Sequence, residues 1–75
     1  MPRESQLKKR SVRIAGHETS ITLEDEFWDV LRSIAQEQDI SINQLISNID
    51  EGRKSNLSSA LRVYILQYLQ NKLAQ

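Results

Sequence analysis

The hydrophobic period of the chain changes at Leu23, from that of a strand to that of a helix. Apolar and polar residues alternate over about residues 18–23, which predicts a strand with Ile21 and Leu23 on its apolar face. A helical pattern then begins without an intervening turn. One strand alone leaves its backbone hydrogen-bonding groups unpaired at both edges. We therefore expect this short strand to pair antiparallel with the same strand of a second protomer.

The length of the chain also favours a dimer. With 75 residues, a single domain is marginally stable and often gains part of its core by oligomerising. Hydrophobic residues make up 39% of the chain and charged residues 27%, which is typical of globular rather than disordered proteins. We expect one folded domain, residues 11–75, in an obligate dimer.

Two helices are predicted directly after the strand. The first, over about 24–38, has acidic residues in its first turn, where carboxylates complement the helix dipole, and carries Trp28 on its flank. The second, over about 41–51, begins at Ser41-Ile42-Asn43-Gln44, which is typical of a capping box. The apolar stripes of these helices and the strand form the predicted dimer core: Ile21, Leu23, Phe27, Leu31, Ile34, Leu45, Ile46 and Ile49.

A third helix is predicted over about 57–73, with Asn56 as its cap. Apolar residues cover more of its surface than one small neighbour would bury. We expect it to add dimer surface or to contact another dimer.

The N-terminal segment is interpreted as a flexible basic arm over residues 1–10, because it is polar and has no sustained apolar period. Val12 and Ile14 alternate with a parity opposite to that of the strand, and Gly16 lies between the two sets. A bulge or turn at this glycine would reset the phase. Residues 11–15 therefore either extend the strand or fold back on it.

Charge is unevenly distributed in a chain whose net charge is zero. Residues 1–17 carry +4 with His17 neutral, residues 18–51 carry −8, and residues 52–75 carry +4. Basic residues near the N-terminus are suited to bind phosphates.

Several classes of function are excluded by composition. The chain has no cysteine and one histidine, so neither disulfides nor a zinc site are expected. No catalytic triad, phosphate-binding loop or metal-ligand spacing can be assembled, so we expect no enzyme, no cofactor and no metal. No apolar run approaches the roughly 20 residues of a membrane span. We expect a cytoplasmic protein without a membrane partner.

The strand, the first helix and the Ser41-Ile42-Asn43 turn together resemble the ribbon-helix-helix family of DNA-binding proteins, of the Arc, MetJ and CopG type. The interval between Leu23 and this turn is similar to that in Arc-type repressors. Further segments resemble a small bacterial subgroup that carries a third helix: Lys9-Arg10-Ser11-Val12, Gly16-His17, Thr19-Ser20-Ile21 and Asn56-Leu57-Ser58-Ser59-Ala60-Leu61-Arg62.

The resemblance implies a mainly α, intertwined homodimer whose two-stranded ribbon enters the major groove of double-stranded DNA. Glu18, Ser20 and Thr22 would face outward on this ribbon. Glu18 departs from the family pattern. A carboxylate there accepts only from cytosine's amino group and is repelled by phosphates, so Glu18 is not among the expected general DNA contacts. Backbone amides at the start of the second helix would bind phosphate. The expected DNA contacts are Lys9, Arg10, Arg13, His17, Ser20, Thr22, Ser41 and Asn43.

The expected function is therefore that of a small homodimeric transcriptional regulator, a repressor of bacterial or phage origin. Two such dimers on adjacent half-sites would be ordinary for the family. The alternative is a protein-interaction module, antitoxin-like or an adaptor, that uses the same dimer scaffold and docks a protein partner on its third helix. Zero net charge and the acidic middle of the chain favour this alternative.

Overall fold

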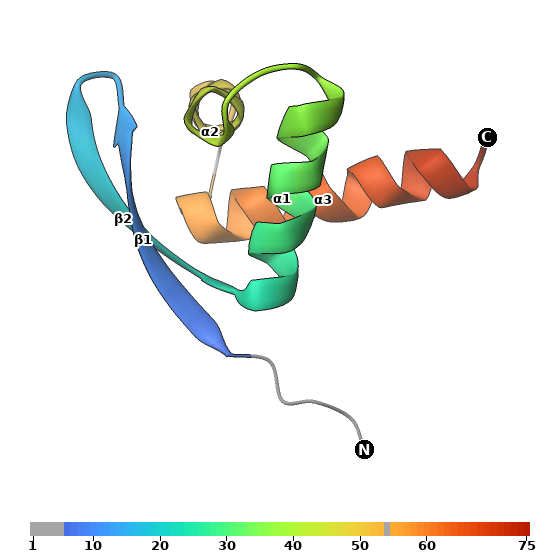
Figure 1. Cartoon of the computed structure of the whole chain (residues 1–75), viewed down its shortest axis with the longest axis horizontal. Coiled ribbons are helices and arrows are strands. Elements are labelled where there is room, and N and C mark those ends of the chain that lie inside the picture. Colours follow the sequence, from blue (N-terminus) through green and yellow to red (C-terminus); the bar gives the residue numbers. More distant parts are fainter. Residues whose placement is uncertain (1–5, 54) are drawn as a thin grey trace.

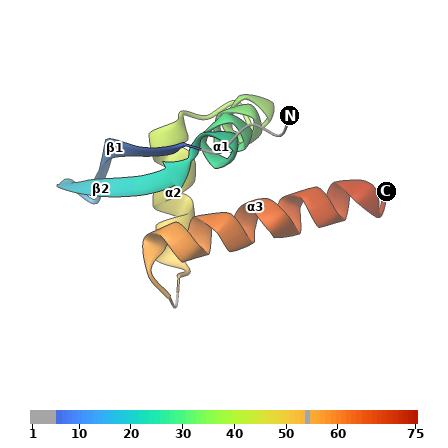
Figure 2. The same ribbon diagram turned by 90° about the horizontal axis from the view of Figure 1, so that it is seen from below.

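A computed structural model describes residues 6–53 and 55–75. A two-stranded antiparallel sheet is followed by three helices, which pack against one face of the sheet (Figure 1). The elements, in chain order, are β1 (Leu7–Ile14), β2 (His17–Glu24), α1 (Asp25–Glu37), α2 (Ile42–Glu51) and α3 (Leu57–Leu73). The C-terminal half of α3 projects beyond the other elements (Figures 1 and 2).

The two strands form a hairpin within one chain. They pair over their whole length, from Leu7 opposite Glu24 to Ile14 opposite His17. A two-residue turn joins them, in which Ala15 and Gly16 have φ of 50° and 82°. Positive φ at both positions is the mark of a type I′ turn, whose twist matches that of the flanking strands. Residues 11–15 therefore fold back on the second strand.

This hairpin corrects two expectations. Leu7–Arg10, expected within the flexible arm, form the first half of β1, while residues 1–5 lie outside the described residues. The chain supplies two strands where one was expected, and β2 pairs with β1 of its own chain. The physical reason is that a strand at the edge of a sheet tolerates many charged side chains, so its apolar signal can be short.

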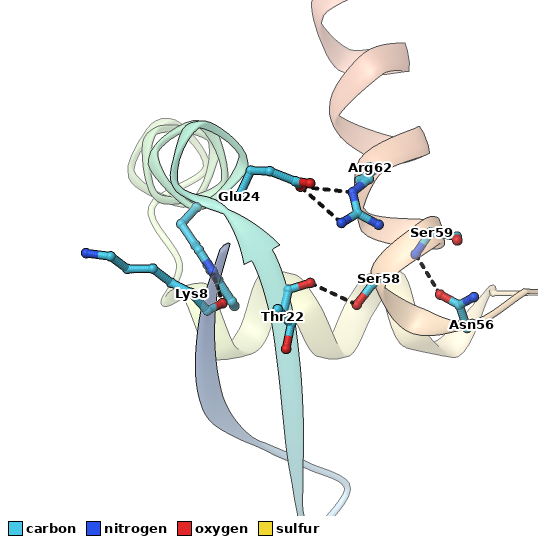
Figure 3. A network of polar contacts seen from close by, with 8 residues as sticks. Lys8, Thr22, Glu24, Asn56, Ser58, Ser59 and Arg62 are labelled. Atoms are coloured by element: carbon cyan, nitrogen blue, oxygen red, sulfur yellow. Dashed lines mark hydrogen bonds and ion pairs between the residues drawn. The ribbon is translucent and has the colours of Figure 1, made fainter. Parts of the chain in front are cut away.

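The N-termini of α2 and α3 are capped by side chains, with one difference from the sequence prediction. Ser41 Oγ accepts a hydrogen bond from the Gln44 backbone amide at 3.0 Å, so the serine half of the capping box forms. The glutamine half does not, because the Gln44 side chain donates to Asn48 at 2.9 Å. Asn56 accepts from the Ser59 amide at 2.8 Å and caps α3 (Figure 3).

The hydrophobic core is closed within one chain. Trp28, expected on the flank of its helix, is fully buried, whereas Phe27 and Ile49, expected in the core, are only partly buried. Helix α3 adds Leu61 and Ile65 to the interior. The core consists of Val12, Ile14, Ile21, Leu23, Trp28, Leu31, Ile34, Ala35, Leu45, Ile46, Leu61 and Ile65.

Polar contacts attach α3 to the junction between β2 and α1 (Figure 3). Ser58 Oγ donates to the Thr22 carbonyl oxygen at 3.3 Å. The Arg62 guanidinium donates to Glu24 Oε1 from Nε at 3.2 Å and from Nη2 at 3.0 Å. A backbone hydrogen bond and the Arg62 guanidinium together hold the pKa of the Glu24 carboxyl below its ordinary value.

Replacing Ala15 with asparagine should stabilise the fold by about 0.5–1 kcal/mol, because asparagine adopts positive φ with less strain than alanine. Urea unfolding followed by circular dichroism measures the change. Ala74→Asn is the matched control, since Ala74 has an ordinary φ of −80°. An equal or lower urea midpoint for A15N would contradict the strained turn.

Acidification should weaken the attachment of α3. Because folding lowers the pKa of Glu24 from its ordinary value of 4.5, the stability that this group confers is present above that pH and is lost as the pH falls through the lowered pKa. Arg62→Met should reduce the drop in urea midpoint between pH 6 and pH 3. Arg32→Met, which breaks an exposed pair with Asp29, should leave the drop as it is in the unaltered protein. Equal drops in R62M and the unaltered protein would show that Arg62 does not act on Glu24.

Candidate nucleic-acid interface

The hairpin register divides the ribbon into two faces. Side chains directly opposite each other in an antiparallel pair point to the same face. Opposite the buried face lies a solvent-exposed face on which Lys9 is paired with Thr22, Ser11 with Ser20, and Arg13 with Glu18. We call this the outer ribbon face: Lys9, Ser11, Arg13, Glu18, Ser20 and Thr22.

Two of the expected DNA contacts lie on the opposite face of the ribbon. Arg10 is paired with the buried Ile21, and its guanidinium carbon lies 5.5 Å from the centre of the Trp28 ring, a cation–π arrangement. His17 pairs with the buried Ile14, beside the turn. The structure thus separates Arg10 and His17 from Lys9 and Arg13.

The face that carries Arg10 is occupied by contacts within the chain. The Trp28 indole nitrogen donates to the Lys8 carbonyl oxygen at 3.0 Å. Lys8 Nζ lies 3.7 Å from Asp25 Oδ1 at the start of α1. These contacts fix β1 to the first turn of α1, so the basic residues of this face stabilise the fold.

Most cations of the described residues have a partner within the chain. Lys9 and Arg13 are the two Lys or Arg side chains in this part of the chain that have neither an ion pair nor a cation–π contact. Both lie on the outer ribbon face. The partnered cations are Lys8 with Asp25, Arg10 with Trp28, Arg32 with Asp29, Arg53 with Asp50, Arg62 with Glu24 and Phe27, and Lys72 with Glu37 and Tyr68.

The start of α2 provides a second group of potential phosphate contacts. Ser41 and Asn43 are both exposed, and Ser41 uses its hydroxyl as the helix cap. The first backbone amides of any helix have no partner within the helix, and the dipole favours an anion there. The exposed carboxylate of Asp39, which precedes the cap, opposes such an anion.

Neither a metal centre nor a membrane span is found in the described part of the chain. No three His, Cys, Asp or Glu residues gather there as ligands of one ion would. None of the helices in residues 6–53 and 55–75 combines the length and apolar character that crossing a bilayer requires.

Sequence reasoning missed Ser11 as part of the outer ribbon face. The Ala15-Gly16 pair could have revealed it, because a two-residue turn at these positions fixes the register of the hairpin and places Ser11 opposite Ser20. The same register separates Arg13 from Arg10 by parity. Ser20 and Thr22 lie on the exposed side, the side on which the alternation places them.

Comparison with known proteins supports the resemblance. A solved structure of an uncharacterized protein from Bordetella pertussis Tohama I is similar to this chain, with 35% sequence identity and a TM-score of 0.80. The match covers 92% of this chain and 60% of that one, so the chain spans less than two thirds of its neighbour. No curated protein matches.

A family model described as a ribbon-helix-helix domain matches residues 7–69, which are most of the chain. Domains of this kind typically bind DNA as dimers and are generally not enzymes. The resemblance seen in the sequence is thus confirmed, and the chain belongs to the ribbon-helix-helix domain family.

Proposed function

We propose that this protein binds double-stranded DNA sequence-specifically through its outer ribbon face, as a small homodimeric transcriptional regulator. One observation carries the proposal. Lys9 and Arg13, the two described cations without a partner in the chain, lie together on the exposed face of a two-stranded ribbon. The major groove of B-DNA is wide enough to admit such a ribbon.

The outer ribbon face has the chemistry that groove binding requires. Lys9 and Arg13 donate to phosphates or to guanine, and the hydroxyls of Ser11, Ser20 and Thr22 can donate or accept at base edges. In this proposal Ser41 and Asn43 hold a phosphate at the start of α2, where the helix dipole attracts anions. Arg10 and His17 remain outside the contact surface, because they lie on the other face.

Self-association is part of the proposal. The family typically forms dimers, and a dimer doubles the number of phosphate contacts in a protein whose net charge is zero. Blocking a promoter on two half-sites is the action of a repressor, so we propose that role in a bacterial cytoplasm. The proposed complex contains DNA and protein, with no cofactor.

Lys9→Ala should weaken binding to all DNA sequences, because a lysine is a point charge that attracts phosphate. The slope of log K against log[salt] should fall by about 1 for each Lys9 that contacts a phosphate. Fluorescence anisotropy with a duplex of about 30 base pairs, in a salt series, measures both quantities. Arg32→Ala is the matched control, since Arg32 lies on α1 and is paired with Asp29. Equal affinity and slope in K9A and the unaltered protein would show that the outer ribbon face does not contact DNA.

The exposed side of α3 favours a second candidate, a protein-interaction module. Four of its apolar residues are unburied: Val63, Leu66, Leu69 and Leu73 are 51%, 55%, 42% and 87% exposed. We call them the α3 ridge. Contiguous exposed apolar patches larger than a few hundred Å² often mark protein contacts. An antitoxin-like or adaptor protein would use this ridge to dock a partner.

Changing the α3 ridge distinguishes a self-contact from a contact with another protein. If the ridge belongs to the homodimer interface, Leu66→Gln/Leu73→Gln should reduce the sedimentation coefficient without loss of helicity, since both side chains are exposed. Leu7→Gln is the control, because Leu7 is exposed but lies on β1. A sedimentation coefficient equal to that of the unaltered protein would exclude the α3 ridge from the homodimer interface.

A further inference from the structure

Glu18 is an unexpected residue on a surface that approaches phosphates. It is the single acidic side chain of the outer ribbon face, and it is exposed to solvent. It has no ion pair and no hydrogen bond from its side chain in the described structure, so it neither caps a helix nor joins two elements. Any backbone phosphate would repel it. The fold therefore gives Glu18 no structural task that offsets this electrostatic cost.

The position of Glu18 suggests what its carboxylate does. The hairpin register places it directly opposite Arg13, one pair away from the turn. Side chains opposite each other on one face of an antiparallel pair have Cβ atoms roughly 5 Å apart, so both can reach one base pair. No ion pair joins Arg13 and Glu18 in the described structure. Even if they met transiently, an exposed pair would contribute little and would open readily.

We propose that Arg13 and Glu18 together read one G·C base pair, an inference that rests on the proposed function. Arg13 would donate to guanine O6 and N7, and Glu18 would accept from the N4 amino group of the cytosine. The major-groove edge of a G·C pair offers two adjacent acceptors on guanine followed by a donor on cytosine. A guanidinium has only donors and a carboxylate has only acceptors, so the two side chains complement this edge.

The same geometry disfavours the other base pairs. A T·A pair leaves the arginine one acceptor, thymine O4, in place of the two acceptors of guanine. An A·T pair offers adenine N7 next to a donor, the N6 amino group, so a bidentate arginine would meet a donor. A reversed C·G pair would bring the Glu18 carboxylate against the acceptors of guanine, where it cannot form a hydrogen bond. Elsewhere on the face, Ser11, Ser20 and Thr22 discriminate weakly, because hydroxyls both donate and accept, and Lys9 acts on phosphate as a point charge. Arg13 and Glu18 therefore carry most of the sequence information.

This proposal predicts that Glu18→Ala affects non-specific affinity and base preference in opposite directions. Glu18→Ala removes a carboxylate that phosphates repel, so binding to DNA of unrelated sequence should stay equal or become tighter. The same change should reduce the preference for G·C at one position of each half-site by about 10-fold, the size expected for one specific base contact. A purely structural or solubilising role for Glu18 would not change the preference at one position alone.

The experiment is selection from a random-sequence duplex library, followed by sequencing of the retained DNA. It compares the unaltered protein with E18A, E18Q and R13K, each checked for folding by circular dichroism. E18A should keep the motif except at one G·C position. R13K should weaken the preference for guanine at the same position, because lysine lacks the planar fork of arginine. Glutamine pairs with adenine N6 and N7, so E18Q should admit a T·A pair there, with adenine in the place of the cytosine and thymine O4 facing Arg13. Glu51→Gln, which removes an exposed carboxylate at the end of α2, should return the original motif.

Two further outcomes are distinguishable. If the unaltered protein retains no DNA at low salt, the proposed function fails and this inference fails with it. If the unaltered protein selects a motif and both E18A and E18Q return that motif with the same preference at every position, DNA binding stands and the role of Glu18 is overturned.

Discussion

The pairing of β1 with β2 in the same chain is the constraint on which the rest of the structure depends. It fixes which side chains of the hairpin face the helices and which face solvent. Val12, Ile14, Ile21 and Leu23 join the core because the register places them on one side. The same register gathers Lys9 and Arg13 on the other side, away from the acidic side chains of the helices that could neutralise them. A shift by one residue would exchange the two faces.

Helix α3 is the second element that completes the core. Leu61 and Ile65 lie in the interior together with residues of the strands and of the first two helices. Arg62 and Ser58 hold the same helix at the end of β2. The other side of α3 is left apolar and exposed. One helix thus closes the interior of the chain and presents an apolar surface outside it.

Sequence patterns predict the helical part of this fold because its signals are local. The 3.6-residue period, Ser41 and Asn56 as caps, and the change of period at Leu23 each involve neighbouring residues. The sequence leaves the hairpin as one of two alternatives for residues 11–15 and assigns the first half of β1 to a flexible arm. The reason is that β1 has only two buried residues, Val12 and Ile14, and four of its eight residues are basic. Strand pairing joins segments that are apart in the sequence, so it leaves no local pattern. The basic half of β1 therefore resembles a flexible arm unless the turn at Ala15 and Gly16 is identified.

The candidate site, like the fold, was only partly predictable from the sequence. Alternation within β2 placed Ser20 and Thr22 outward without knowledge of a partner strand. Separating Arg13 from Arg10 required the knowledge that both lie on a strand, since only then does parity send them to opposite faces. The burial of Trp28, and the position of Arg10 over its ring, depend on separate elements meeting and leave no pattern in the sequence.

The origin of both strands in one chain has a consequence for symmetry. A ribbon made from two identical chains has a two-fold axis through its centre, so its two halves read the same bases in opposite directions. The outer ribbon face here lacks such an axis: β1 presents Lys9, Ser11 and Arg13, and β2 presents Glu18, Ser20 and Thr22. Under the proposed function, DNA bound to this ribbon is therefore read with a direction, and any palindrome in its target comes from how whole chains are arranged along the duplex.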